Sequence, residues 1–385
     1  MNQKIAIRAA TEADRPALEQ IWRYCFNDGD TFQRWYFSQY YRTGECLVAT
    51  VADTLAASLQ IIDLPTRVGE TIVRSGYIVG VDCLPEYRGL GLTHRLMQMA
   101  LEDYAPAHGI QLLHLMPFEA DFYERYGFVF SDYHFDMDLD IDEFYRPEDR
   151  DAAHQHIWRE LRPEELTEAL PLLEAVYTRG TARYMAAVMR KGLRRWQALV
   201  EDLFMEGGHF KLLFDEQEQA VGYLAYIMKE GALFVREAMT CTVSARQALY
   251  YFIASHRSQV KRVQWSAPED ERIAFRRKKD KSGVHYRPFM MARVMDPQIL
   301  PLFAARLPEQ DLSFSVAGCG SYRWPAKSVS LEKCEAAAQK HALDLSQLTQ
   351  MVFDRGALTT ETQAEFAPLA ALFTIKASFF NNEYF

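Results

Sequence analysis

The sequence lacks the features that mark several protein classes. Its six cysteines form no C-x-x-C pair, and the two closest, Cys319 and Cys334, are 15 residues apart. This spacing argues against a zinc site or a disulfide framework, so we expect reduced, mostly buried thiols and no metal. The N-terminus has no basic segment followed by an apolar stretch, and no apolar run approaches the length of a membrane span. We therefore expect a cytoplasmic protein that does not contact a membrane.

The chain also lacks a basic charge balance. It has 43 lysines and arginines against 52 acidic residues, a net charge of −9. This balance argues against nucleic-acid binding and suits cationic substrates, although it can equally serve solubility alone. The ten histidines are scattered without a nucleophile beside a base, so no hydrolase triad is expected. The apolar share of 49% and the length of 385 residues predict a globular chain of two or three domains.

Hydrophobic periodicity divides the chain into three parts. Residues 1–150 predict an α/β unit, residues 151–290 repeat its order of elements, and residues 291–385 predict a small α+β unit. Between 138 and 153 the sequence is acidic, polar and broken by a proline, which favours the first boundary. Strands are expected at 46–51, 54–62, 71–83 and 110–116, and helices at 92–106, 331–340 and 344–352.

The strongest local motif joins the strand that ends at Cys83 to the helix that begins near Leu92. It reads Cys83-Leu84-Pro85-Glu86-Tyr87-Arg88-Gly89-Leu90-Gly91-Leu92-Thr93. Glycines let a backbone approach a ligand closely, and free N–H groups at a helix start bind phosphate. The motif is neither a Walker loop nor a G-x-G-x-x-G fingerprint. It predicts a pyrophosphate cradle, and the alternative is a glycine-containing turn before an ordinary helix.

A second motif follows about thirty residues later: Asp121-Phe122-Tyr123-Glu124-Arg125-Tyr126-Gly127-Phe128. Together the two motifs resemble the GNAT superfamily of N-acetyltransferases, whose cofactor loop reads Gln/Arg-x-x-Gly-x-Gly/Ala and whose later segment reads Phe-Tyr-x-x-x-Gly-Phe. Arg88 and Gly91 match the loop, whereas Thr93 departs from Gly/Ala. The resemblance implies acetyl-CoA as cosubstrate. Its implied cofactor contacts are Val81, Asp82, Cys83, Arg88, Gly89, Leu90, Gly91, Leu92 and Thr93.

The same resemblance implies that Tyr123 protonates the leaving CoA thiolate. A positioned general acid contributes about 10²–10⁴-fold to a rate. Tyr126 is the rival acid, and for each tyrosine the alternative is core packing with a satisfied hydroxyl. Transfer is expected to pass directly from thioester to amine, without a covalent enzyme intermediate.

The layout of the whole chain is similar to that of Eis-type (enhanced intracellular survival) acetyltransferases. That resemblance implies tandem GNAT folds with mixed, centrally splayed sheets and a C-terminal α+β domain like the sterol carrier proteins. It also implies a ring-like homo-oligomer, often of six subunits. The presumed second copy has no glycine after its strand FVREAMTC, where the sequence reads Thr242-Val243-Ser244. We therefore expect the second domain to bind no CoA.

The chain ends in an aromatic tail, Phe379-Phe380-Asn381-Asn382-Glu383-Tyr384-Phe385. Burial of apolar area at about 25 cal/mol per Å² favours docking of such a tail over fraying. The Eis resemblance implies that the α-carboxylate of Phe385 serves as the base. A docked tail with no chemical role is the alternative.

The acceptor is expected to be an amine of a small molecule or peptide. The family resemblance places Asp28, Trp35 and Tyr36 at the acceptor pocket, with Glu383 beside them, where carboxylates and aromatic faces would hold a cation. A solvated loop beside core aromatics is the alternative. Aminoglycosides, polyamines and lysine peptides all fit this charge class. The competing functions are transfer of a longer acyl chain and a lipid-binding or acyl-CoA-sensing protein without turnover.

Overall fold

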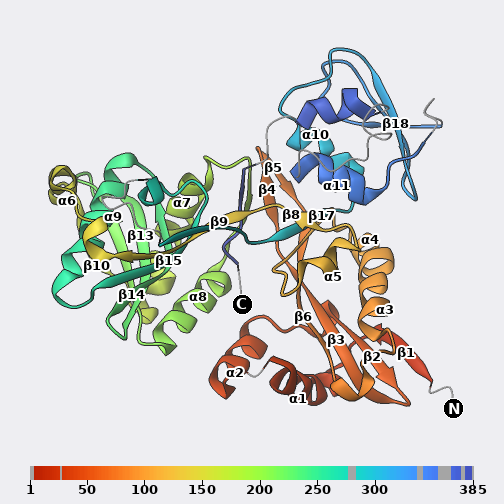
Figure 1. Ribbon diagram of the computed structural model, residues 1–385, viewed down its shortest axis with the longest axis horizontal. Helices are drawn as coiled ribbons and strands as arrows, with labels where there is room; N and C mark the ends of the chain where they lie inside the picture. The colour runs from red at the N-terminus through yellow and green to blue at the C-terminus, as the bar shows by residue number, and fades with distance from the viewer. Residues whose placement is uncertain are drawn as a thin grey trace. The chain divides into compact units, whose positions relative to one another are not determined.

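The computed structural model in Figure 1 describes residues 4–26, 28–275, 283–335, 341–353, 366–373 and 378–383. The chain forms two compact units. The first comprises residues 1–131, 185–188 and 289–385, and the second comprises residues 132–184 and 189–288. None of the helices in the described segments is long and apolar enough to cross a membrane.

The first unit is built on a seven-stranded mixed sheet. Its strands follow the order β1-β2-β3-β6-β7-β17-β8, and β6 and β7 form its parallel pair. All other neighbours in the sheet are antiparallel. The bounds are β1 Ile5–Ala9, β2 Cys46–Val51, β3 Thr54–Asp63, β6 Ser75–Cys83, β7 Leu112–Leu115, β17 Met291–Val294 and β8 Val129–Phe130.

One long helical segment packs on this sheet. It begins as α3 (Leu92–Gln98), passes through a π-helical stretch, η4 (Met99–Tyr104), and ends in α4 (Ala105–Ala107). Its apolar residues recur at helical spacing, so one face enters the core with Leu59, Ile78 and Leu113. Helices α1 (Arg15–Phe26), α2 (Asp30–Gln39) and the short α5 (Ala120–Glu124) complete this part.

A small second sheet of the first unit has the strand order β21-β11-β4-β5. The strand predicted over 71–83 is in fact two strands, β5 (Thr71–Val73) and β6, because residues 71–73 turn back onto β4 (Thr66–Val68) as a hairpin. The chain's terminal strand β21 (Phe379–Phe380) pairs in parallel with β11 (Ala186–Val188). The tail is therefore docked through backbone pairing as well as through its aromatic rings.

The C-terminal part of the first unit contains a three-stranded antiparallel sheet and short helices. Its strands are β18 (Leu312–Val316), β19 (Gly320–Trp324) and β20 (Glu332–Cys334), and its helices include α10 (Leu300–Phe303) and α11 (Leu345–Phe353). The helix expected over 344–352 is confirmed as α11. The helix expected over 331–340 is wrong at its start, because residues 332–334 pair with β19; residues 336–340 lie outside the described part.

The second unit repeats the topology of the first. Its sheet has the order β10-β12-β13-β14-β15-β9-β16, and again a parallel pair, β14 with β15, follows three antiparallel strands. This confirms the predicted tandem folds with mixed sheets. The strands are β10 Ile157–Glu160, β12 His209–Phe214, β13 Ala220–Lys229, β14 Ala232–Thr240, β15 Arg262–Pro268, β9 Tyr133–Asp140 and β16 Val284–Pro288, and the helices are α6 Arg150–His154, α7 Leu166–Thr181, α8 Leu193–Met205 and α9 Val243–Ser255.

Each seven-stranded sheet contains one strand that is distant in sequence from its neighbours. In the first sheet β17 lies between β7 and β8, although about 160 residues of chain separate it from β8. In the second sheet β9 lies between β15 and β16, although it directly follows β8 along the chain. Strand β9 precedes the boundary expected near 150. The three predicted domains stay a prediction.

Candidate active site

The centre of the first sheet opens between its two parallel strands. Residues 75–78 of β6 pair with residues 112–115 of β7, and beyond Ile78 the pairing ends. The register of β6 against β3 also shifts at this point, which marks a β-bulge. Gly80 adopts φ +61°, and a Cβ there would lie 2.5 Å from the Trp22 ring. Only glycine fits at this position. Residues 79–83 of β6 make no hydrogen-bonded pairs with β7, so this edge of the strand is open.

The glycine loop continues from this open edge. A single 3₁₀ turn over Pro85–Tyr87 is followed by Gly89 and Gly91 with φ of +82° and +71°. Gly91 is the N-cap of α3 and has no side-chain cap, so the first N–H groups of the helix stay free of intrahelical and capping partners. Arg88 folds back, and its Nε donates to the carbonyl of Cys83 at 3.4 Å. The cradle therefore fits a pyrophosphate, which a helix start of this kind binds through N–H groups.

The two candidate tyrosines differ in what their hydroxyl groups contact. Tyr123 on α5 is 4% exposed and packs in the core beside Phe128, and burial raises its pKa to about 12. Its hydroxyl makes no hydrogen bond within the described residues. The hydroxyl of Tyr126 lies 2.9 Å from Nδ1 of His94. The raised pKa keeps the phenol of Tyr123 protonated at neutral pH, and its role as the acid stays a prediction.

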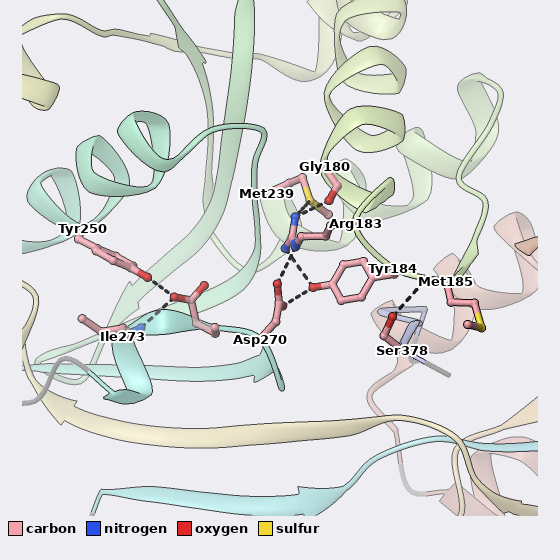
Figure 2. Close-up of polar contacts among 10 residues, drawn as sticks. Gly180, Arg183, Tyr184, Met185, Met239, Tyr250, Asp270, Ile273 and Ser378 are labelled. Atoms are coloured by element: carbon pink, nitrogen blue, oxygen red, sulfur yellow. Dashed lines mark hydrogen bonds and ion pairs between the residues drawn. The ribbon is translucent and has the colours of Figure 1, made fainter. Parts of the chain in front are cut away.

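The docked tail reaches the neighbourhood of Tyr123. Met185 N donates to Ser378 Oγ at 3.0 Å (Figure 2), and Phe379, Phe380 and Glu383 further along the tail are buried. The pKa of Tyr77 is raised by burial first, and then by the charges of Glu383 and Tyr123, which places both groups near one phenol. Phe385, the predicted base, lies outside the described residues.

Two parts of the chain match family models described as an acetyltransferase (GNAT) domain. One match spans residues 6–130 and the other spans residues 186–294. The chain contains two GNAT acetyltransferase domains. The predicted enzyme class, a GNAT-type N-acetyltransferase, is confirmed by these matches, and the first of them contains both motifs on which the prediction rested.

Several solved structures share the GNAT-containing fold over almost the whole chain. A protein from Enterococcus faecalis V583, described as a probable N-acyltransferase, has a TM-score of 0.80 and 17% identity over 99% of this chain and 100% of its own. A GCN5-related N-acetyltransferase from Anabaena variabilis has a TM-score of 0.80 and 18% identity over the same shares. Eis1 from Mycobacterium abscessus has a TM-score of 0.73 and 17% identity, again over 99% and 100%. No curated protein sequence matches the chain.

The predicted acceptor residues of the first GNAT domain lie in different surroundings. Asp28 accepts a hydrogen bond from Trp22 Nε1 at 3.0 Å. Trp35 and Tyr36 are buried, and the Tyr36 hydroxyl donates to Gln60 Oε1 at 2.9 Å. Their rings are therefore part of the packing beneath the sheet rather than open faces, and their roles stay predictions.

Sequence reasoning missed two apolar side chains directly after β7. Phe118 is 80% exposed and Met116 is 38% exposed. Both lie between the end of the parallel pair and α5, the helix that carries Tyr123. The run Met-Pro-Phe after a buried strand was the available indication, because neighbouring exposed apolar side chains can form a patch that binds a ligand.

Asp82 carries a titratable group that the sequence did not reveal. It was expected to contribute its backbone, but its carboxylate is 5% exposed and accepts hydrogen bonds from Ser58 N at 2.7 Å and from Ser58 Oγ at 3.0 Å. Burial raises the pKa of Asp82 to about 7, against the opposing effect of these bonds. The bulge therefore holds a carboxyl group that titrates near neutral pH.

The second GNAT domain has a sheet that also separates, but its opening is occupied. β14 and β15 stop pairing after Val235, and Arg183 bridges the segments beyond that point (Figure 2). Its Nε lies 2.6 Å from Asp270 Oδ2, and its other nitrogens contact the Tyr184 hydroxyl at 3.0 Å and Met239 Sδ at 3.9 Å. Met239 belongs to the end of β14, and Asp270 lies just after β15.

The helix start of the second GNAT domain is also already capped. Thr242 Oγ1 accepts a hydrogen bond from Ala245 N at 3.0 Å, whereas α3 has a glycine at the same position. The N–H group of Ala245, which could otherwise bind a phosphate, therefore already donates a hydrogen bond within the chain. Together with the Arg183 bridge, this supports the prediction that the second domain binds no CoA.

Proposed function

We propose that the protein transfers the acetyl group of acetyl-CoA to a primary amine of a cationic acceptor. The observation that carries the proposal is the unpaired edge of β6 beyond Ile78, which leads directly into the uncapped glycine loop. An extended pantetheine arm can pair with that edge as a further strand would, and the loop can bind the pyrophosphate. The acetyl end is then directed toward Tyr123.

In the proposed reaction the neutral amine attacks the thioester carbonyl carbon. An N–C bond forms and the C–S bond breaks, while backbone N–H groups of Val81 to Cys83 stabilise the negative charge on the carbonyl oxygen. The hydroxyl of Tyr123 gives its proton to the departing sulfur. A phenol whose pKa is about 12 is fully protonated at neutral pH, so its proton is in place when the sulfur departs.

The proton of the amine needs an acceptor, and we assign it to the α-carboxylate of Phe385. An α-carboxyl group with a pKa of about 3.5 is too weak a base to deprotonate a free ammonium. It can attract the cation and take the proton as the nitrogen becomes acidic in the tetrahedral intermediate. The docking of β21 and the burial of Glu383 support delivery of the tail to this place.

The acceptor class follows from charge. Glu383 lies near Tyr77, and Glu119 and Asp121 flank the start of α5 with carboxylates. These groups favour a cation over a neutral or acidic acceptor, so aminoglycosides, polyamines and lysine peptides are the proposed classes. The exposed Phe118 ring after β7 would add cation–π contact.

The finer relationship to the Eis-type enzymes is part of the proposal. The match in fold with Eis1 over nearly the whole chain supports it. A sterol-carrier-like C-terminal domain, a homo-oligomer and a cytoplasmic location are proposed on the same basis. Sedimentation of the purified chain measures the oligomer directly.

A thiol-release assay tests the function. The protein is incubated with acetyl-CoA and, in turn, a polyamine, an aminoglycoside and a lysine peptide, and free CoA thiol is followed with time. We expect release that depends on at least one amine and is lost in Tyr123→Phe. Tight CoA or lipid binding without release from any acceptor would instead favour a sensor or carrier protein and would refute the enzyme.

A further inference from the structure

A groove of about 640 Å³ lies beside the long helical segment of the first unit. One wall is formed by successive turns of α3 and its continuation, from His94 to Pro106. The opposite wall combines the end of α5, β17 and the turn between β18 and β19. The C-terminal part of the unit therefore closes a space that the sheet and helix alone would leave open.

Arg293 on β17 is the most unusual residue of this groove. Its Nε is buried without a hydrogen-bond partner, and the side chain forms no ion pair or hydrogen bond within the described residues. Asp344 and Glu102 are near enough to influence it, but neither is within ion-pair distance. A buried guanidinium nitrogen without a partner is costly, because it has lost water and gained no compensating bond. Such a cation in a groove indicates an anionic ligand.

Gly127 provides the space that this guanidinium occupies. A Cβ at Gly127 would lie 2.8 Å from Arg293 Nη1 and 2.8 Å from the Cβ of Ser346. The glycine of the second sequence motif thus serves a purpose in this chain beyond the turn after α5. It lets the Arg293 side chain pass toward the groove.

Further groups that can bind an anion line the same space. Arg125 supplies a second guanidinium, Gln98 an amide, and His94 a ring that contacts Tyr126. An arginine guanidinium can donate two parallel hydrogen bonds to two oxygens of one phosphate. The lining also includes the acidic Glu102, which belongs to the helix turn farther from the glycine loop.

We propose that this groove binds a phosphate monoester, with Arg293 as its principal anchor and Arg125 as its second cation. The coenzyme of the proposed function is one source, so this part of the inference rests on that function. In coenzyme A the 3′-phosphate is on the ribose that directly follows the pyrophosphate. The groove begins at His94, only one residue after the loop of 88–93 proposed to hold that pyrophosphate. A separate phosphorylated ligand is the other source.

Calorimetric binding of CoA and of dephospho-CoA, which lacks only the 3′-phosphate, tests the inference. We expect the wild-type chain to bind CoA about tenfold or more tightly than dephospho-CoA, the gain expected of one charge-assisted contact. Arg293→Gln should reduce this preference to less than about threefold without weakening dephospho-CoA. Arg306→Gln is the charge-matched control, since this exposed arginine lies outside the groove, and it should keep the full preference.

A second variant keeps the test valid should Arg293→Gln fold poorly. Gln98→Glu is a nearly isosteric change of an exposed residue in the lining, and it places a negative charge beside the phosphate. It should lower the preference for CoA in the same direction. Thermal unfolding of each variant shows whether the fold is retained.

Inorganic phosphate, titrated at saturating CoA, distinguishes the two sources. No preference for CoA, together with phosphate binding that Arg293→Gln abolishes, would assign the groove to a separate phosphorylated ligand. No preference and no Arg293-dependent phosphate binding would overturn the inference. Because these are binding measurements, CoA bound without turnover would count against the proposed enzyme and not against the groove.

Discussion

The hydroxyl of Tyr126 and Nδ1 of His94 lie 2.9 Å apart and join the end of α5 to the first turn of α3. This contact occupies the phenol that sequence reasoning left as the rival acid. The phenol of Tyr123, three residues earlier, has no such partner within the described residues. We therefore propose that Tyr126 holds α5 against α3 and that Tyr123 donates the proton.

The tyrosines can be separated by matched substitutions. Tyr123→Phe should lower kcat at least about tenfold, because the general acid is lost, while acetyl-CoA affinity changes little. Tyr126→Phe should lower kcat less than about threefold and reduce thermal stability slightly, since one hydrogen bond is removed. Steady-state kinetics and CoA titrations measure both. A larger kinetic loss in the Tyr126 variant would reverse the assignment.

Because burial raises the pKa of Tyr123 to about 12, the acid stays protonated through the accessible alkaline range. The rate should therefore rise with pH as the acceptor amine loses its proton, and then level off without a fall up to about pH 10. A pH profile of kcat with a polyamine acceptor measures this. A decline between about pH 8 and 10 in an enzyme that remains folded would argue against Tyr123 as the acid.

The end of the chain should be intolerant of change in length. Deleting Phe385, or adding two residues after it, moves the α-carboxylate away from the place to which β21 directs the tail. We expect loss of turnover with unchanged CoA affinity. A variant extended at the N-terminus by the same residues is the control. Normal turnover of the extended C-terminus would leave the tail a structural role alone.

Asp82 gives the folded protein a defined dependence on pH. Its pKa is raised to about 7 from about 3.9 in an unfolded chain, so its favourable contribution is complete below about pH 4 and is lost as pH rises through 7. Asp82→Asn keeps both contacts with Ser58 and removes the charge. The variant should be more stable than wild type at about pH 8, by up to about 4 kcal/mol, and equal to it near pH 4. Urea unfolding at the two pH values measures the difference, and equal stability at the higher pH would contradict the assignment.

Gly80 should not tolerate even one added methyl group. Its φ of +61° disfavours other residues, and the new Cβ would lie 2.5 Å from the Trp22 ring. We expect Gly80→Ala to cost about 2–4 kcal/mol and to weaken CoA binding, because the bulge would have to flatten. Gly89→Ala is the control, because Gly89 also has a positive φ but an added Cβ there would meet no atom within 4 Å. It therefore measures the backbone strain without the steric clash. Urea unfolding should show a smaller stability loss for that control, and CoA titration of Gly80→Ala measures its expected loss of affinity.

Part of this site was predictable from sequence because its determinants are local. The turn of residues 88–93, the strand before it and the helix after it are encoded by a proline, two glycines and an apolar stripe within one stretch of chain. Tyr123 was proposed from the resemblance of a short motif after a buried strand to the family's tyrosine segment, and its role stays a prediction. Local patterns of this kind survive in the folded protein because tertiary contacts reinforce them.

The rest depends on partners that are remote in sequence. Residues 332–334 precede an alanine-rich run and were expected to be helical, but their pairing with β19 decides otherwise. Trp35 and Tyr36 were expected at the acceptor pocket, and only the position of α2 shows that they are buried. The sequence did not indicate a role for Arg183 or Arg293. The partner of Arg183, Asp270, is far away in the chain, and only the fold shows that Arg293 has no partner within the described residues.

The position of β17 bears on how the protein is made. While a ribosome has released only the first 130 residues, the nascent first sheet still has β7 and β8 without the strand that joins them. That gap can close only after residue 294 has emerged, by which time all of the second sheet has been synthesised. A fragment of residues 1–130 should therefore aggregate when it is expressed alone. Limited proteolysis that removes β17 should unfold the central part of the first sheet, where the coenzyme is proposed to bind.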